Sequence, residues 1–456
     1  MTDLPHKHER NQSEAEHRFY HQFTSYHHAG FLHCQLVSRA FFWGRNCGGQ
    51  YVYLFTVNSV VWLLLDLGVS KSLMYSLQRD KADPKALYSM SLVFFGISLI
   101  LSIIIFQLFA NQILGSNSYP GIIVLALSVY IALFQLHNRQ KVMSIGMNRI
   151  KDYSLLLILP SLLFVILILP LFWLFPQALR MQGSYLLYVS VMLGISAFFH
   201  FRIVKQIGFR WHWDLPLVKR SYGLGFKAFL SEYMAIMMTR ADVLLLKHLG
   251  SFADLGIYML AINFIDIINV TSNMIGVVLL NKFSALNDDT ASLVILRKIF
   301  VVMILFNLVC ITGMAVLGQF VINFMYTSDY IGAYKAFMYL IPAIFGLTLG
   351  SLFNTFLWSK GFPIFTIIAP ALATLVKLLA SSLFIPRMGY LGAALASSIV
   401  YPMWFIILMI WYFSTHKDQK PGSLIVRKED LLGMGSMLKS LLSKSENLRH
   451  ARRIHQ

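Results

Sequence analysis

The sequence of 456 residues is 57% hydrophobic and only 13% charged, whereas soluble domains carry about a quarter charged residues. This composition excludes an ordinary soluble protein and indicates that lipid is the solvent for much of the chain. The net charge of +18 would favour nucleic-acid binding in a soluble protein. Here the Lys and Arg residues lie between apolar segments, so we interpret them as topology signals and expect no nucleic-acid partner.

Residues 1–46 form an atypical, His-rich N-terminal segment. Seven of the fourteen histidines lie within residues 1–34, and residues 29–44 are too short and too polar for a membrane span. A metal-binding tract is one interpretation, but no ligand spacing recurs. We favour a shifted coding frame that has replaced a hydrophobic first helix, because His codons read one base later can begin Ile or Met codons. The three cysteines have no CxxC spacing, so neither a disulfide framework nor a metal site is expected.

Eleven apolar runs follow, each of the length that a helix needs to cross a bilayer, roughly 20 residues. They cover residues 51–77, 86–110, 119–137, 154–176, 183–204, 222–248, 252–280, 299–326, 333–358, 363–386 and 389–413. The runs are continuous rather than alternating, which excludes a membrane β-barrel. We therefore predict an all-α, polytopic membrane protein.

The connections between these runs alternate in charge. One set, taken with the tail after residue 413, contains 25 Lys and Arg residues, and the other set contains four. The positive-inside rule places the first set and the C-terminus in the cytoplasm. In the basic tail, Leu431, Met434, Leu438, Leu441 and Leu442 recur at helical spacing, which predicts an amphipathic helix on anionic membrane lipids.

A weak internal repeat predicts how the runs divide. Gly49 and Tyr51 open the second helix of the first half, as Gly256 and Tyr258 do in the second half. A polar residue follows each Tyr after fifteen positions, and these residues are Asp66 and Asn273. With a first helix supplied, the total becomes twelve, in two six-helix lobes related by an axis along the membrane normal. The predicted boundaries are 1–46 for the N-terminal segment, 47–205 for the first lobe, 206–221 for a cytoplasmic linker, 222–413 for the second lobe and 414–456 for the basic cytoplasmic tail.

Residues 222–286 and 48–73 carry a family resemblance. The first stretch has Asp242 in a long helix, a loop leading to Gly256 and Tyr258, the acidic Asp266 and an NKFSAL exit, and the second has an LG turn. These features resemble the Wzx-type polysaccharide flippases of the multidrug/oligosaccharidyl-lipid/polysaccharide exporter superfamily. The resemblance covers roughly residues 47–445 and departs at residues 1–46, where the family has a first helix.

The resemblance implies a fold and a function. Such proteins have two six-helix lobes around a central cavity and move lipid-linked sugars between leaflets by alternating access. The implied substrate is an undecaprenyl-diphosphate-linked oligosaccharide for O-antigen, capsule or a similar glycan, flipped outward across the bacterial inner membrane. A polysaccharide polymerase and chain-length machinery are the implied protein partners.

Two alternatives belong to other function classes. A cation-coupled drug antiporter of the same superfamily is the nearest one. A membrane-embedded polysaccharide polymerase or glycosyltransferase is the other, but it would need a catalytic loop with acids, His or Arg placed around the diphosphate. The predicted outer loops are short, and no nucleophile and base pair stands out. We therefore expect no enzyme activity and no cofactor.

Charged residues inside the predicted spans are the candidates for the site, because each costs about 2.5 to 3.5 kcal/mol on insertion scales. They are Asp66, Lys227, Glu232, Arg240, Asp242, Asp266 and Lys377. The three cations are candidates for attracting the diphosphate, and Arg240 is favoured because a guanidinium grips phosphate bidentately. The four acids are candidates for coupling to a cation or proton, or for structural pairing. Ion pairs from Arg240 and Asp242 to neighbouring helices are an equally good interpretation.

Polar residues also share helix faces. Asn263, Asp266, Asn269 and Asn273 lie within one arc of about 120° at 100° per residue. Thr374, Lys377 and Ser381 share a face of one helix, and Asn58, Trp62 and Asp66 share a face of another. Such stripes line a wet cavity, which would make the three Asn residues sugar ligands, or they form interhelical hydrogen bonds.

Overall fold

The computed structural model describes residues 45–78, 83–114, 120–147, 149–174, 180–208, 215–285, 289–326, 328–360, 363–419 and 421–424. The His-rich segment up to residue 44 and the amphipathic helix predicted in the tail lie outside the described residues. The predicted boundaries of the lobes, linker and tail stay predictions.

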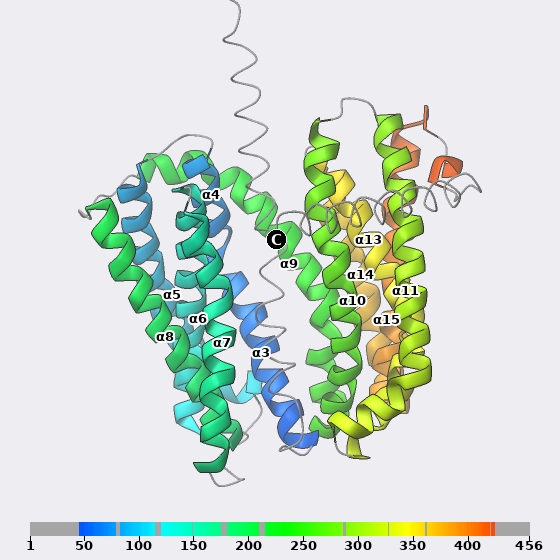
Figure 1. Cartoon of the computed structure of the whole chain (residues 1–456), viewed down its shortest axis with the longest axis horizontal. Coiled ribbons are helices and arrows are strands. Elements are labelled where there is room, and N and C mark those ends of the chain that lie inside the picture. The colour runs from blue at the N-terminus through cyan, green and yellow to red at the C-terminus, as the bar shows by residue number, and fades with distance from the viewer. Residues whose placement is uncertain are drawn as a thin grey trace, which may run out of the picture.

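The described residues form α-helices and short 3-10 helices, and no strand is found among them. The first bundle contains α3 (Arg45–Asp66), α4 (Val69–Gln78), α5 (Pro84–Leu114), α6 (Gly121–Gly146), α7 (Ile150–Leu174) and α8 (Arg180–Ile207). The second contains α9 (Leu215–Leu249), α10 (Phe252–Ala285), α11 (Asp289–Met325), η2 (Ser328–Tyr330), α12 (Gly332–Tyr339), α13 (Ile341–Ser359), α14 (Phe365–Met388), α15 (Tyr390–Thr415) and η3 (Pro421–Leu424). The two bundles stand side by side, and α9 runs obliquely between them (Figure 1). The all-α, polytopic architecture is confirmed.

Ten helices of the described part are long and apolar enough to cross a membrane. They correspond to the predicted runs except 222–248, which is α9. This helix carries Glu232, Arg240 and Asp242 within three turns, and it is packed among other helices. The central spans of α3, α6 and α10 are each 67% buried, whereas that of α5 is 17% buried. The outer helices therefore present apolar side chains to lipid, as the composition requires.

Two of the predicted runs are broken helices. The run 51–77 is divided between α3 and α4, because Leu67 and Gly68 have φ of 45° and 83°. The left-handed conformation costs a residue with a Cβ about 1–2 kcal/mol, and Gly68 adopts it without that cost. The run 333–358 is divided between α12 and α13 at Leu340. Both breaks lie inside apolar sequence, where hydropathy gives no signal.

The bundles touch at both ends of the molecule. At the start of α3, a Cβ on Gly49 would overlap the carbonyl oxygen of Phe252 on α10. Near the opposite end, a Cβ on Gly68 would lie 2.5 Å from the carbonyl oxygen of Gly225 on α9. Only glycine allows such close backbone approach. Because α3 and α10 are the equivalent helices of the predicted repeat, their contact agrees with an axis between the bundles.

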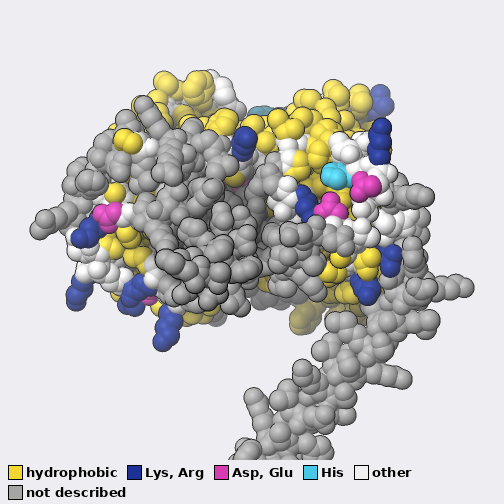
Figure 2. Space-filling view, turned by 90° about the horizontal axis from the view of Figure 1, so that it is seen from above, with side chains coloured by type: hydrophobic (Ala, Val, Ile, Leu, Met, Phe, Trp, Pro, Cys, Tyr) yellow, Lys and Arg dark blue, Asp and Glu magenta, His cyan; other side chains and the backbone are white. Residues whose placement is uncertain are grey.

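Helix α4 lies at one end of the molecule, uppermost in Figure 1, and this end is the predicted cytoplasmic face. Seen from this side, basic side chains lie around the rim of the described surface, and hydrophobic ones cover much of its flanks (Figure 2). The 25 basic residues of the cytoplasmic set include Arg139 and Lys141, because the sequence places both in the connection after the run 119–137, and that expectation was wrong. Both are buried within α6, which continues to Gly146. The charge bias between the two faces remains large without them.

Candidate functional site

A buried ion pair joins α9 to α14 in the second bundle. Lys377 Nζ lies 2.8 Å from Asp242 Oδ2, and both side chains are 0% exposed. Lys377 also donates to the hydroxyl of Tyr401 at 2.9 Å, and the hydroxyls of Tyr258 and Ser397 donate to Asp242 Oδ2. These partners come from α10 and α15. An ion pair out of contact with water needs such added hydrogen bonds to offset its desolvation.

A second ion pair lies beside the first but is less enclosed. Arg240 Nη2 lies 3.1 Å from Asp266 Oδ2, and the side chains are 15% and 20% exposed. Arg240 is on α9 and Asp266 on α10, so this pair joins α9 to a second neighbouring helix. We call the residues of the two pairs, together with Tyr258, Ser397 and Tyr401, the second-bundle charge cluster. Its charges balance, and Arg240 is its partly exposed cation.

The polar stripe of α10 makes contacts to neighbouring helices along its length. Asn269 accepts a hydrogen bond from the hydroxyl of Ser351 at 3.4 Å, and Asp266 is paired with Arg240 of α9. Asn263 is buried, and Asn273 is half-buried. Interhelical bonding therefore accounts for part of the stripe. Asp266, Asn269 and Asn273 are its half-buried members.

The first bundle has its own buried ion pair at the break between α3 and α4. Arg139 Nη2 on α6 lies 3.1 Å from Asp66 Oδ1, and the guanidinium also donates to the carbonyl of Ser91 at 3.1 Å. Asp66 Oδ2 accepts the backbone N–H of Ser70 at 3.1 Å, which caps α4. Asp66 thus holds the broken helix to α6. This is a structural pairing, the second of the two interpretations given for the acids.

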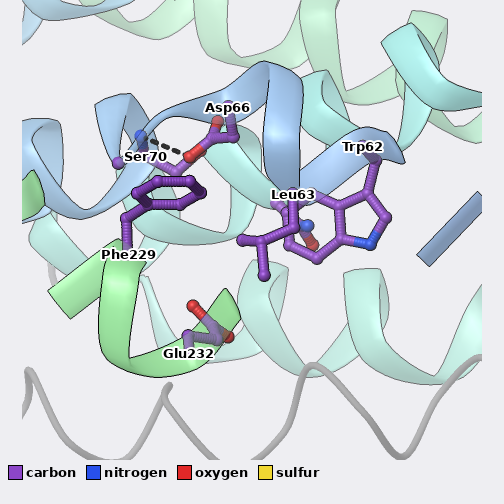
Figure 3. Close-up of a pocket in the computed structure, with 8 residues that line it drawn as sticks. Trp62, Leu63, Asp66, Ser70, Phe229 and Glu232 are labelled. Carbon is purple, nitrogen blue, oxygen red and sulfur yellow. Dashed lines mark hydrogen bonds between the residues drawn. The ribbon is translucent and has the colours of Figure 1, made fainter. Parts of the chain in front are cut away.

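A pocket lies at the same break, between the bundles. It is lined by Trp62, Leu63, Asp66, Gly68, Ser70, Asn138, Phe229 and Glu232 and has an empty volume of about 280 Å³. Phe229 and Glu232, on α9, face Leu63, Trp62 and Asp66 across it (Figure 3). Glu232 therefore comes together with Asp66 and not with Arg240. Lys227, two residues before Phe229, has an exposed side chain.

Several residues of these sites were not among the sequence candidates. Arg139 and Asn138 directly follow an apolar run and looked like the beginning of a connection. A signal was present for Arg139, because Asp66 in a membrane helix requires a buried partner. Tyr258 had been noted only as part of the internal repeat and of the family resemblance. No sequence signal distinguished Ser397 or Tyr401 from other polar residues of an apolar helix.

Two helical bundles with ion pairs inside the spanning helices and a pocket between them define a two-bundle, multipass membrane protein of a transporter fold. The structure of the "Lipid II flippase MurJ, inward closed conformation" matches with a TM-score of 0.67 at 16% identity, covering 86% of this chain and 87% of that one. A model of the polysaccharide biosynthesis protein family matches residues 48–335. That is more than half of the chain, and the chain belongs to this family.

Multidrug transporters share the fold as well. A mutant of the Vibrio cholerae MATE transporter VcmN matches with a TM-score of 0.59 at 13% identity, covering 90% of this chain and 98% of that one. An inward-facing multidrug resistance MATE family transporter of the MOP superfamily matches with a TM-score of 0.60 at 13% identity, covering 89% and 96%. No functionally curated protein matches the chain in sequence. The likeness to these structures establishes the fold alone, and the family match assigns the chain to the polysaccharide biosynthesis proteins.

Proposed function

We propose that this protein flips an undecaprenyl-diphosphate-linked oligosaccharide, such as an O-antigen or capsule repeat unit, from the cytoplasmic to the outer leaflet by alternating access. Membership in the polysaccharide biosynthesis family carries this proposal. The fold shared with a lipid II flippase supports it. The protein acts in the bacterial inner membrane and supplies its product to a polysaccharide polymerase and chain-length machinery.

Arg240 is the proposed contact of the diphosphate. Lys377 is enclosed with Asp242, whereas Arg240 keeps part of its guanidinium exposed while it pairs with Asp266. A guanidinium can bind phosphate with two parallel hydrogen bonds. The exposed Lys227 is the second candidate, and Asn263, Asn269 and Asn273 would meet sugar hydroxyls when the bundles part. The pocket between the bundles has far less room than a lipid-linked oligosaccharide needs, so the substrate requires another conformation.

The orientation is part of the proposal. The charge bias places the C-terminus and the α4 end of the molecule in the cytoplasm, where a lipid-linked sugar is loaded. A reporter that is active only outside the cell should be silent when fused to the C-terminus. Activity of that fusion would reverse the orientation.

The direct test uses the purified full chain in proteoliposomes. We expect it to move a fluorescent undecaprenyl-diphosphate oligosaccharide between leaflets, measured as the fraction of label that an impermeant quencher reaches. Arg240→Gln should abolish this movement, whereas Asp152→Asn should preserve it, since Asp152 pairs with Arg149 and Arg202 away from the bundle interface. Equal quenching in vesicles with and without the protein would overturn the proposal.

The drug antiporter is the second candidate, favoured by the fold shared with multidrug transporters. It predicts that a sodium or proton gradient drives ethidium across the same proteoliposomes. Gradient-driven ethidium movement without movement of the lipid-linked sugar would replace the proposed function with this one.

A further inference from the structure

A buried carboxylate in the first bundle holds two arginines that come from different elements. Asp152, in the first turn of α7, has a side chain that is only 5% exposed. Its Oδ2 lies 3.1 Å from Nη1 of Arg149, directly before α7, and its Oδ1 lies 3.0 Å from Nη2 of Arg202, near the end of α8. One negative charge thus fixes two guanidiniums against each other, and the three residues together keep a positive charge.

Both guanidiniums can accept a further partner. The side chains of Arg149 and Arg202 are 33% and 42% exposed, and each guanidinium has more N–H donors than one shared carboxylate can satisfy. Lys151 on α7 and Lys205 on α8 are exposed as well, so four cations surround a single acid. Charges that only mark the topology of a membrane protein need no such fixed geometry. This arrangement is therefore suited to binding an anion.

Exposed apolar side chains continue from these cations along both helices. On α8, Phe198 and Phe201 are exposed and share a face with Arg202 and Lys205 through their i, i+3, i+4 and i+7 spacing. The matching stripe of α7 starts at Lys151 and continues through the exposed residues Leu155, Ile158 and Leu162. The two stripes lie on neighbouring helices, because Leu156 of α7 packs in one cluster with Val191, Ile195 and Phe199 of α8.

Fixed cations above an apolar stripe match the chemistry of an anionic phospholipid. A phosphate accepts charge-assisted hydrogen bonds from guanidinium groups, and basic pockets between spanning helices on the cytoplasmic side bind anionic head groups. The charge bias places this end of α7 and α8 at the cytoplasmic face, whose rim carries basic side chains (Figure 2). A zwitterionic phospholipid is disfavoured, since it would bring a cation of its own toward Arg149 and Arg202.

We propose that the cytoplasmic ends of α7 and α8 bind an anionic phospholipid of the surrounding membrane. Its phosphate meets Arg149 and Arg202, with Lys151 and Lys205 beside them, and its acyl chains lie along the exposed stripes of the two helices. The bound lipid ties α7 to α8 on the outer side of the first bundle. The site lies away from the bundle interface, so its occupancy is separate from transport and the proposal stands whichever substrate is carried.

The test compares the phospholipids that the purified full chain retains. The chain in neutral detergent receives phosphatidylglycerol or phosphatidylcholine at equal concentration, and native mass spectrometry measures the bound lipid. We expect the wild-type chain to retain phosphatidylglycerol in preference and to melt at a higher temperature with it. The double variant Arg202→Gln with Lys205→Gln should bind phosphatidylglycerol about thirtyfold more weakly, the loss expected for two cations at an anionic lipid.

The matched control is Lys298→Gln. Lys298 is an exposed cation at the same predicted face, on the largely unburied α11, and belongs to a different bundle. This variant should retain phosphatidylglycerol as the wild-type chain does. An equal loss in Lys298→Gln and in the double variant would show that the whole basic face attracts lipid, and it would overturn the site.

The wild-type comparison tests the proposal even if the double variant does not fold. Equal retention of phosphatidylglycerol and phosphatidylcholine would overturn it. Tighter retention of undecaprenyl diphosphate, lost in the double variant, would assign the site to the carrier lipid and overturn the phospholipid. Displacement of phosphatidylglycerol by inorganic phosphate at equal concentration would show that the acyl chains contribute nothing, and it would also overturn the lipid site.

Discussion

Two charged residues of α9, Arg240 and Asp242, have different roles because their ion pairs differ in solvent exposure. Asp242 and Arg240 are two positions apart, yet Asp242 is sealed with Lys377 while Arg240 and Asp266 retain partial exposure. A sealed pair contributes mainly to the arrangement of α9 against α14. A partly exposed pair can exchange one partner for a substrate anion at lower cost.

The role of Arg240 can be separated from its pairing. Arg240→Gln should abolish the appearance of glycan at the cell surface. Arg240→Lys should retain part of it, since Lys keeps the positive charge but cannot donate two parallel hydrogen bonds to a phosphate. The double variant Arg240→Gln with Asp266→Asn removes both charges, so it should recover any lost folded protein without recovering glycan. The measurement is surface glycan normalised to monodisperse, detergent-extracted protein. Recovery of glycan in the double variant would make Arg240 a purely structural residue.

Lys377 should behave in the opposite way. Lys377→Met leaves the Asp242 carboxylate buried without its cation, which costs about 3–5 kcal/mol, so the yield of monodisperse protein should fall sharply. Adding Asp242→Asn should restore much of the yield. Lys227→Met, at an exposed position of the same membrane protein, serves as the matched control and should leave the yield unchanged. Normal yield from Lys377→Met alone would contradict the buried pair.

Among the helices, the break between α3 and α4 positions the residues that line the pocket between the bundles. It turns Asp66 into the cap of α4 and exposes the end of α3 toward the pocket. Gly68 is central to it, because its φ is +83° and the backbone of Gly225 lies against it. In the sequence, the only sign of this break is the LG turn, Leu67 and Gly68, inside an apolar run.

Gly68→Ala should therefore destabilise the protein, both through the left-handed backbone and through the contact with Gly225. The matched control is Gly194→Ala in α8, where a Cβ meets nothing within 4 Å. Because Gly costs a helix about 0.8–1.0 kcal/mol relative to Ala, that variant should melt at the same temperature or higher. The two melting temperatures in detergent decide this, and equal shifts would show that the break is not constrained at Gly68.

For the whole molecule, the two glycine contacts close opposite faces. Gly49 lets α3 reach α10 at one end, and Gly225 lets α9 reach α4 at the other. Alternating access requires one face to part while the other stays shut. A larger side chain at Gly49 or Gly225 would prevent the two bundles from meeting at the face where that glycine lies.

We expect Gly225→Leu to open the predicted cytoplasmic face and Gly49→Leu to open the other. The reporter is Ser70→Cys, a buried pocket position, in a background with Cys34, Cys47 and Cys310 changed to Ser. Its labelling by a maleimide should accelerate in Gly225→Leu and stay slow in Gly49→Leu. Faster labelling in both variants would indicate general loosening rather than two separate closures.

Features that depend on local composition follow from the amino-acid sequence alone. Length and hydropathy located the apolar helices, loop charge gave an orientation to test, and the cost of charge in lipid selected Asp66, Glu232, Arg240, Asp242, Asp266 and Lys377. Hydropathy did not locate the helix breaks, since Leu67 and Leu340 are themselves apolar and lie inside runs long enough to span a membrane. It also assigned Arg139 to a connection, because a charge at the end of an apolar run looks the same whether the helix stops or continues.

Only the tertiary structure decided which charges meet. Asp66 and Arg139 are 73 positions apart, and Asp242 is paired with Lys377 rather than with the Arg240 two residues before it. Such pairings depend on how helices pack and rotate against one another, which composition and periodicity do not specify. The same applies to the pocket, whose two acids come from α3 and α9 and whose unsatisfied amide comes from α6. The sequence shows that charge is buried, and the packing of the two bundles determines whether it is neutralised or left to bind a ligand.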